Sequence, residues 1–122
     1  MSLTHAWNGL CFTVRTQRNA KIHLTIGFGA FTMAVWLGLG VLPLSILVLT
    51  IGAVLVGETI NTTVEAIVDL LSPEWHAQAK TAKDVSAGAV LILSLTAVIV
   101  GLLILGPPLW GQIARLLGWQ SL

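Results

Sequence analysis

Residues 44–69, LSILVLTIGAVLVGETINTTVEAIVD, join an apolar run to a row of acidic residues. The run carries no charged residue as far as Gly57, and at about 20 residues such a helix crosses a bilayer. The polar residues that follow are spaced 3, 4 and 4 residues apart. Because a helix turns about 100° per residue, this spacing places them on one face. We therefore predict a membrane-spanning helix whose inner half carries an acidic stripe, defined as Glu58, Asn61, Glu65 and Asp69.

The acidic stripe requires an explanation, because a carboxylate at the bilayer centre costs at least about 2.5–3.5 kcal/mol. One explanation is structural, with the acids paired to interfacial Arg and Lys residues for helix packing. The other is functional: a proton acceptor, or a site for a cation or a metal–polyphosphate complex. We favour the functional explanation, because ionisable residues inside membranes usually serve function. From Glu58 to Asp69 the stripe extends about 16 Å along the helix, toward the cytoplasmic membrane surface.

The composition supports a membrane protein. The 122 residues are 56% hydrophobic and 9% charged, whereas about 25% of the residues of a soluble domain are charged. The net charge of +1 gives no basic surface for nucleic acid. Cys11 is the single cysteine, which excludes an intrachain disulfide.

The chain is expected to form one all-α domain, residues 1–122, with three transmembrane helices and an N-terminal amphipathic surface helix. Pro43 is expected to separate the first two spans. Three spans make a poor closed bundle, so we also expect an oligomer. The expected segments are a surface helix over about 3–20, spans over 22–42, 44–71 and 84–106, and an interfacial tail over 107–122 that is anchored by tryptophans.

The basic residues predict the orientation in the membrane. Lys and Arg number three before the first span, none between the first two spans, two before the third span and one after it. By the positive-inside rule, the N-terminus and the loop at 72–83 lie in the cytoplasm, and the C-terminus lies outside it. The apolar run begins only after about 21 polar and aromatic residues, which argues against a cleaved signal peptide.

The segment after the second span supplies positive charge. Residues 72–76, SPEWH, indicate a turn that opens a helix, and Lys80, Lys83 and Asp84 follow. Together with the acidic stripe, these residues suggest a binding site in which phosphate oxygens, a metal ion and carboxylates alternate. Because carboxylates repel phosphate, Mg²⁺ would have to bridge them. The sequence has no Walker loop, kinase glycine-rich loop or dinucleotide fingerprint.

Two blocks of this sequence resemble the signature of the prokaryotic diacylglycerol kinase family, which includes undecaprenol kinases. They are Glu58-x-x-Asn61-Thr62-x-x-Glu65-x-x-Val68-Asp69 and Ala82-Lys83-Asp84-x-x-Ala87-Gly88-Ala89-Val90. The stretch RTQRN at 15–19, followed by His23, is similar to the undecaprenol kinase branch in particular. The resemblance covers roughly residues 5–106.

The resemblance implies a homotrimer in the bacterial inner membrane that transfers the γ-phosphoryl group of ATP to a lipid hydroxyl at the cytoplasmic face. It implies that Glu58 is the general base and that Glu65 is a metal ligand. The other implied site residues line the nucleotide and substrate site or contact phosphate: Asn61, Asp69, His76, Lys83, Asp84, Arg15 and Arg18. Members often carry glutamate, a second metal ligand, where this chain has Gln17. Gln17 offers only a neutral carbonyl oxygen, so either the metal is held with less charge here, or Asp69 or a water compensates.

Two alternatives to a lipid kinase stay open at this point. A small proton- or cation-coupled transporter would explain the intramembrane acids but not the neighbouring Lys-Asp pair, and a non-catalytic scaffold would use the acids in structural ion pairs. For a kinase, the aliphatic lipid-facing residues do not distinguish undecaprenol from diacylglycerol, although the RTQRN stretch favours undecaprenol.

Overall fold

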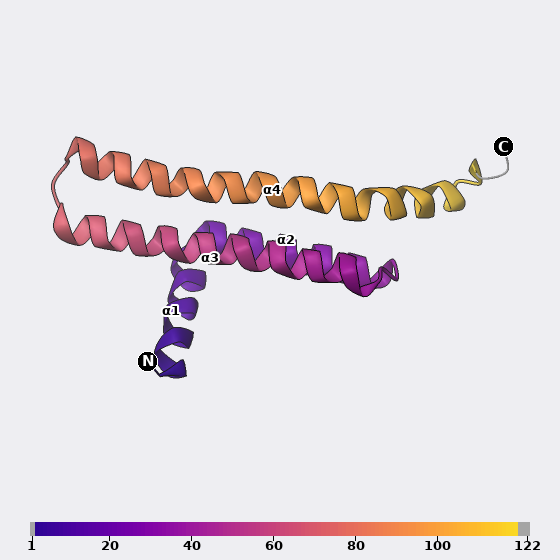
Figure 1. Cartoon of the computed structure of the whole chain (residues 1–122), viewed down its shortest axis with the longest axis horizontal. Helices are drawn as coiled ribbons and strands as arrows, with labels where there is room; N and C mark the ends of the chain where they lie inside the picture. Colours follow the sequence, from indigo (N-terminus) through magenta and orange to yellow (C-terminus); the bar gives the residue numbers. More distant parts are fainter. Residues whose placement is uncertain (1, 120–122) are drawn as a thin grey trace.

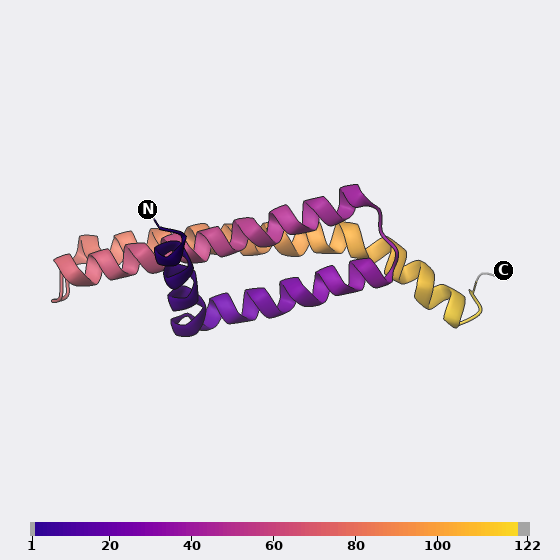
Figure 2. The same cartoon turned by 90° about the horizontal axis from the view of Figure 1, so that it is seen from below.

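The computed structural model describes residues 2–119, and within them the chain forms four helices and no strand. The helices are α1 (Leu3–Thr16), α2 (Arg18–Trp36), α3 (Val41–Leu71) and α4 (Ala77–Leu116). Helices α3 and α4 run side by side in opposite directions, α2 packs along α3, and α1 lies across the bundle (Figure 1; Figure 2). The expected all-helical fold is confirmed.

Two of these helices, α3 and α4, are long and apolar enough to cross a membrane. Only 22% of the most apolar window of α3 and 6% of that of α4 is buried within the chain. Most of their apolar surface therefore faces outward, which is opposite to the core helix of a soluble protein. Helix α2 does not meet the same criterion among the described residues, because Arg18, Asn19 and Lys21 in its first turn lower its mean hydropathy. Its crossing of the membrane stays a prediction.

The expected boundary at Pro43 was wrong. Helix α2 ends at Trp36 rather than at residue 42, because Gly38 adopts a positive φ of 69°. The N–H of Gly38 donates to the carbonyl of Val35 and the N–H of Leu39 donates to that of Ala34, as in a glycine-terminated helix end. Pro43 lies in the first turn of α3, where its missing N–H leaves no intrahelical hydrogen bond unmade.

The last helix begins where the turn at 72–76 predicted a helix start, but it ends later than the expected span over 84–106. Helix α4 begins at Ala77, and the ring nitrogen Nδ1 of His76 caps it by accepting a hydrogen bond from the backbone N–H of Gln78. It continues through Pro107 and Pro108 to Leu116, so the expected separate tail at 107–122 begins as part of this helix. In Figure 2 its yellow part points away from the line of the earlier turns, as prolines inside a helix predict. Residues 120–122 lie outside the described chain.

The N-terminal helix is shorter than the expected 3–20. It ends at Thr16 because Gln17 is extended, with φ −93° and ψ 116°, and α2 begins at the next residue. Ser2 caps its start by accepting a hydrogen bond from the N–H of Thr4. The break at Gln17 lets α1 turn across the bundle instead of continuing α2.

Close packing of α3 on α4 depends on a glycine beside the acidic stripe. A Cβ atom added at Gly57 would lie 2.3 Å from Cδ1 of Leu93 on α4. Gly57 directly precedes Glu58. Val54, near Gly57 in the sequence of α3, and Val90, near Leu93 in that of α4, are buried. The missing side chain at Gly57 therefore brings α4 close to the start of the stripe.

We expect Gly57→Ala to lower the free energy of unfolding by about 1–3 kcal/mol, because Leu93 must leave its position. Gly52→Ala on the same helix is the control, since no atom lies within 4 Å of its added Cβ, and it should be neutral or stabilising by up to about 1 kcal/mol. Thermal unfolding in detergent measures both changes. Shortening Leu93 to Ala should lessen the effect of Gly57→Ala. Equal effects at Gly57 and Gly52 would contradict this packing.

Candidate active site

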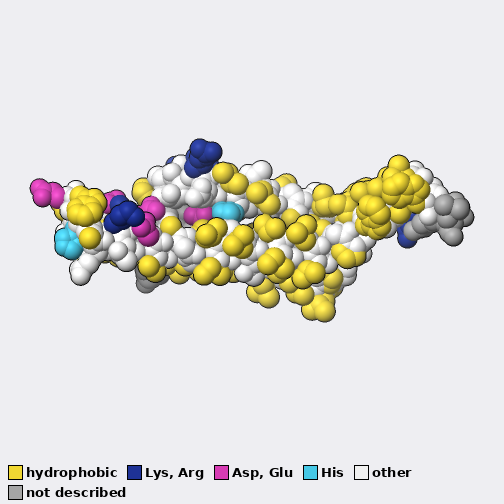
Figure 3. Space-filling model, turned by 90° about the horizontal axis from the view of Figure 1, so that it is seen from above, with side chains coloured by type: hydrophobic (Ala, Val, Ile, Leu, Met, Phe, Trp, Pro, Cys, Tyr) yellow, Lys and Arg dark blue, Asp and Glu magenta, His cyan; other side chains and the backbone are white. Residues whose placement is uncertain are grey.

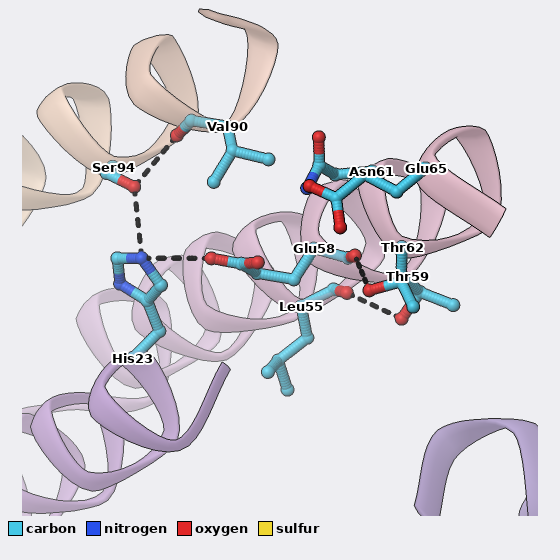
Figure 4. A network of polar contacts seen from close by, with 9 residues as sticks. All are labelled: His23, Leu55, Glu58, Thr59, Asn61, Thr62, Glu65, Val90 and Ser94. Atoms are coloured by element: carbon cyan, nitrogen blue, oxygen red, sulfur yellow. Dashed lines mark hydrogen bonds and ion pairs between the residues drawn. The ribbon is translucent and has the colours of Figure 1, made fainter. Parts of the chain in front are cut away.

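The site is centred on Glu58, whose residue is 2% exposed and lies in the middle of α3. Its Oε1 atom is 3.2 Å from Nε2 of His23, which α2 contributes (Figure 4). Burial follows from the packing of α2, α3 and α4 around this turn. A carboxyl group is thus held away from water, as the sequence predicted for the start of the acidic stripe.

His23 also contacts the third helix of the bundle. Its Nε2 atom is 3.3 Å from Oγ of Ser94, and the Ser94 hydroxyl donates to the backbone carbonyl of Val90 at 2.8 Å (Figure 4). Sequence reasoning did not assign His23 or Ser94 to the site. The available signal was that His23 is the only titratable residue in the expected span 22–42, but nothing local indicated that it faces Glu58.

The next turn of the stripe holds Asn61 and Glu65. The Nδ2 group of Asn61 donates to Oε1 of Glu65 at 3.0 Å. Within the described chain, two buried side-chain oxygens have no hydrogen-bond partner: Oδ1 of Asn61 and Oε1 of Glu58, whose approach to His23 lacks hydrogen-bond geometry. Asn61 is 8% exposed, so both oxygens are withdrawn from water and available to a ligand.

The C-terminal end of the stripe, around Asp69, is charged and open. Asp69 forms an ion pair with Lys83 that joins α3 to α4, and Lys80 pairs with Asp84 along α4. Lys83 therefore pairs across helices with Asp69, and not with its sequence neighbour Asp84. A pocket of about 420 Å³ lies here, lined by both lysines, Asp69, His76 and the turn at 72–76. Four predicted site residues (Asp69, His76, Lys83 and Asp84) thus lie around the same turn.

A second cavity begins beside Glu58 and extends along α3 away from Asp69. It is a groove of about 430 Å³ between α2, α3 and α4, and its lining is aliphatic apart from His23, Thr50 and Ser94. We call it the apolar groove; it runs from His23 and Ser94 to Leu109. On the face drawn in Figure 3, most charged side chains gather at one end of the molecule, and hydrophobic side chains dominate the rest.

The remaining predicted residues lie on the N-terminal helices. Arg15 and Arg18 are exposed, and Gln17 is half-buried at the junction of α1 and α2. Among the described residues, no hydrogen bond or ion pair joins these three side chains to the acidic stripe. The structure therefore brings Glu58, Asn61, Glu65 and Asp69 onto one line but does not bring Arg15, Gln17 or Arg18 into contact with it.

The chemistry of the stripe suits one magnesium ion with few protein ligands. Mg²⁺ is commonly held by one or two carboxylates together with substrate phosphates. Glu65 offers a carboxylate and Asn61 an unpartnered carbonyl oxygen. Within residues 2–119 no group of three or more His, Cys, Asp and Glu side chains is arranged as a metal site. These residues fit an ion that is completed by phosphate oxygens, not a closed protein cage.

Comparison with known proteins places the chain. The family model for prokaryotic diacylglycerol kinase matches residues 4–105. A diacylglycerol kinase of Synechocystis sp. is 42% identical over 110 residues, which cover 89% of this chain and 63% of the relative. An undecaprenol kinase of Bacillus subtilis is 36% identical over 108 residues, 88% of each chain. A diacylglycerol kinase of Escherichia coli is 34% identical over 70 residues, 57% of each chain.

The match thus covers α1 to α3 and most of α4, including the whole acidic stripe, the turn at 72–76, Lys83 and Asp84. The chain spans less than two thirds of the Synechocystis relative but most of the Bacillus subtilis one. By this match, the chain belongs to the prokaryotic diacylglycerol kinase family, a family of lipid kinases.

Proposed function

We propose that this protein is an ATP-dependent lipid kinase that transfers the γ-phosphoryl group to the hydroxyl of a membrane lipid, undecaprenol or diacylglycerol. The observation that carries the proposal is the position of Glu58 on α3. It is buried, and its contact residue His23 lines the apolar groove. The pocket lined by Asp69, His76, Lys80 and Lys83, which we call the polar pocket, lies further along the same helix. A lipid alcohol presents the same combination, an apolar tail that ends in a reactive hydroxyl. Family membership supports the same reaction.

Glu58 is proposed as the general base. The tail of the lipid would lie in the apolar groove with its hydroxyl at the carboxylate, which removes the hydroxyl proton as the oxygen attacks the γ-phosphorus and ADP leaves. A carboxylate in apolar surroundings is a stronger proton acceptor than one in water. Exclusion of water from Glu58 also favours transfer to the lipid over hydrolysis of ATP.

The nucleotide is proposed to lie along the stripe from the polar pocket toward Glu58. Glu65 is four residues from Asp69 and seven from Glu58, or about 6 Å and 10 Å along the helix axis. With the adenine ring of ATP bound near Asp69, Lys83 and His76, the phosphates would point toward Glu65 and Asn61. Positive charge for the phosphates would come from Lys80 and Lys83 on α4, and from Arg15 and Arg18 on α1 and α2.

Magnesium is proposed as the second cofactor, held by Glu65 and Asn61. When bound, the ion would neutralise charge on the transferring phosphoryl group, which is the main requirement of this reaction. Asn61 already donates to Glu65, so its amide holds that carboxylate in place. Gln17 is proposed as a neutral ligand that reaches the metal from the junction of α1 and α2.

The assembly is proposed to be a homotrimer in the bacterial inner membrane, with the N-terminus and the 72–76 turn in the cytoplasm. The outward apolar faces of α3 and α4 support a lipid environment and contacts with other copies. With this orientation the polar pocket opens to cytoplasmic ATP and the apolar groove lies within the bilayer. The lipid substrate and the other copies are the partners; nucleic acid is not expected.

Label transfer tests the function. The purified chain is incubated with γ-labelled ATP, Mg²⁺ and either a polyprenol or a short-chain diacylglycerol, and the lipid fraction is counted. We expect label on the lipid, and the ratio of kcat/KM values identifies the substrate. If neither lipid acquires label, the kinase assignment is wrong, and proton- or cation-coupled transport becomes the explanation for the buried acids.

Glu58→Gln should lower kcat for the lipid by about 10²–10⁴-fold, because the amide keeps the shape of the side chain but cannot accept the proton. The matched control is Thr63→Val on the same helix, whose exposed hydroxyl donates only to the carbonyl of Thr59. It should leave kcat unchanged. Activity of Glu58→Gln near that of the wild type would show that another group is the base.

Gln17→Glu should lower the Mg²⁺ concentration for half-maximal activity by about fivefold, the equivalent of roughly 1 kcal/mol, because it adds a charged ligand. Gln112→Glu, near the far end of α4, is the control for added charge and should leave the titration unchanged. Identical Mg²⁺ titrations of Gln17→Glu and wild type would mean that position 17 does not reach the metal.

A further inference from the structure

The contact between His23 and Glu58 has no role in the reaction as proposed so far. We propose that His23 is a positioning residue for Glu58: its imidazole holds one carboxylate oxygen, so that the other oxygen faces the lipid hydroxyl, and Ser94 holds the imidazole. This inference rests on the proposed lipid kinase activity and assigns further residues to it.

The contacts of Ser94 favour one protonated form of the imidazole. The Ser94 hydroxyl donates to the carbonyl of Val90 at 2.8 Å, and its oxygen lies 3.3 Å from Nε2 of His23, where it can accept a hydrogen bond. In the proposed arrangement the hydrogen of the imidazole is therefore on Nε2. The same Nε2 lies 3.2 Å from Oε1 of Glu58, so one N–H group faces two acceptors.

An N–H on Nε2 would lie within reach of both Ser94 and Glu58, and Oε1 of Glu58 lacks a hydrogen bond although it is buried. A small rotation of the ring turns the N–H onto the carboxylate. An unsatisfied buried oxygen beside a donor is a strong orienting element, because a hydrogen bond to a charged group contributes about 1.5–3 kcal/mol. His23 can thus fix the carboxylate once a substrate lies against its other oxygen.

The place of His23 links the base to the substrate. His23 and Ser94 both line the apolar groove, in which Thr50 is the third residue with a hydrogen-bonding side chain. The hydroxyls of Thr50 and Ser94 donate to the carbonyls of Ile46 and Val90 in their own helices. The imidazole is therefore the polar group of the groove that is best placed to act on Glu58, and it comes from a different helix.

Kinetics separate positioning from a structural role. His23→Phe keeps an aromatic ring without the N–H and should lower kcat about tenfold or more, because misplacing a reacting group by about 1 Å costs up to 10²-fold. KM for ATP should stay within about twofold, since the polar pocket lies about 16 Å along α3. His23→Gln places an amide N–H near Nε2 and should recover at least about threefold of the loss.

Ser94→Ala should lower kcat less than His23→Phe does. The control is Thr96→Ala, which removes an exposed hydroxyl that donates to the carbonyl of Ile92 on the same helix, and it should match the wild type. If the wild type labels lipid and His23→Phe has wild-type kcat, or if His23→Gln is no better than His23→Phe, positioning by His23 is wrong while the kinase function stands. If the wild type labels no lipid, the function itself fails.

A readout without turnover covers the case in which His23→Phe does not fold. In protein labelled with ¹⁵N-histidine, loss of a signal in His23→Gln assigns the ring of His23 among the three histidines. We expect hydrogen on Nε2 in the wild type and a change of the ring signals in Ser94→Ala. A ring with hydrogen on Nδ1 alone would overturn the proposal, because it offers no N–H to either Ser94 or Glu58.

Discussion

The structure depends on one constraint: a carboxyl group buried among three packed helices needs a polar partner within reach. Glu58 meets this constraint through His23 of α2, which Ser94 of α4 contacts in turn. The contact ties together the helices that enclose the site. Gly57 beside it lets α4 approach α3 closely enough for Ser94 to reach the ring. The same packing excludes water from the carboxylate.

The length of α3 then joins two environments that are rarely found on one helix. Toward its N-terminal half the neighbours are aliphatic and form the apolar groove. Toward its C-terminal end the neighbours are Lys83, Lys80 and His76, which form the polar pocket. A kinase for a membrane lipid needs both environments, because one substrate dissolves in the bilayer and the other in water. The acidic stripe connects these two environments along one helix.

Much of this could be predicted from the sequence, for physical reasons that apply residue by residue. The spacing of Glu58, Asn61, Glu65 and Asp69 defines one helix face without any tertiary information, and the structure confirms that face. Helix ends were less predictable: Gly38 and Pro43 both break helices in principle, and only the backbone conformation shows that Gly38 ends one helix while Pro43 begins the next. The prolines of α4 bend a helix that the sequence suggested they would end.

The pairing of His23 with Glu58 could not be predicted, because it depends on the register between α2 and α3 and on the length of the 37–40 connection. The same holds for Lys83, since its partner Asp69 lies on another helix. Side chains on one helix are related by a fixed rotation, whereas pairs between helices are set by packing. The sequence therefore indicated the type of reaction, but it did not indicate how the reacting groups are arranged.

In the proposed reaction a lipid in the apolar groove presents its hydroxyl to Glu58. Photocrosslinking can locate this hydroxyl, with a lipid alcohol that carries a diazirine next to it and mass spectrometry to identify the modified residues. We expect insertion into the groove residues nearest Glu58, which are Val54, His23 and Ser94, and suppression by excess unmodified lipid. Insertion confined to the turn at 72–76 or to α1 would show that the lipid binds elsewhere.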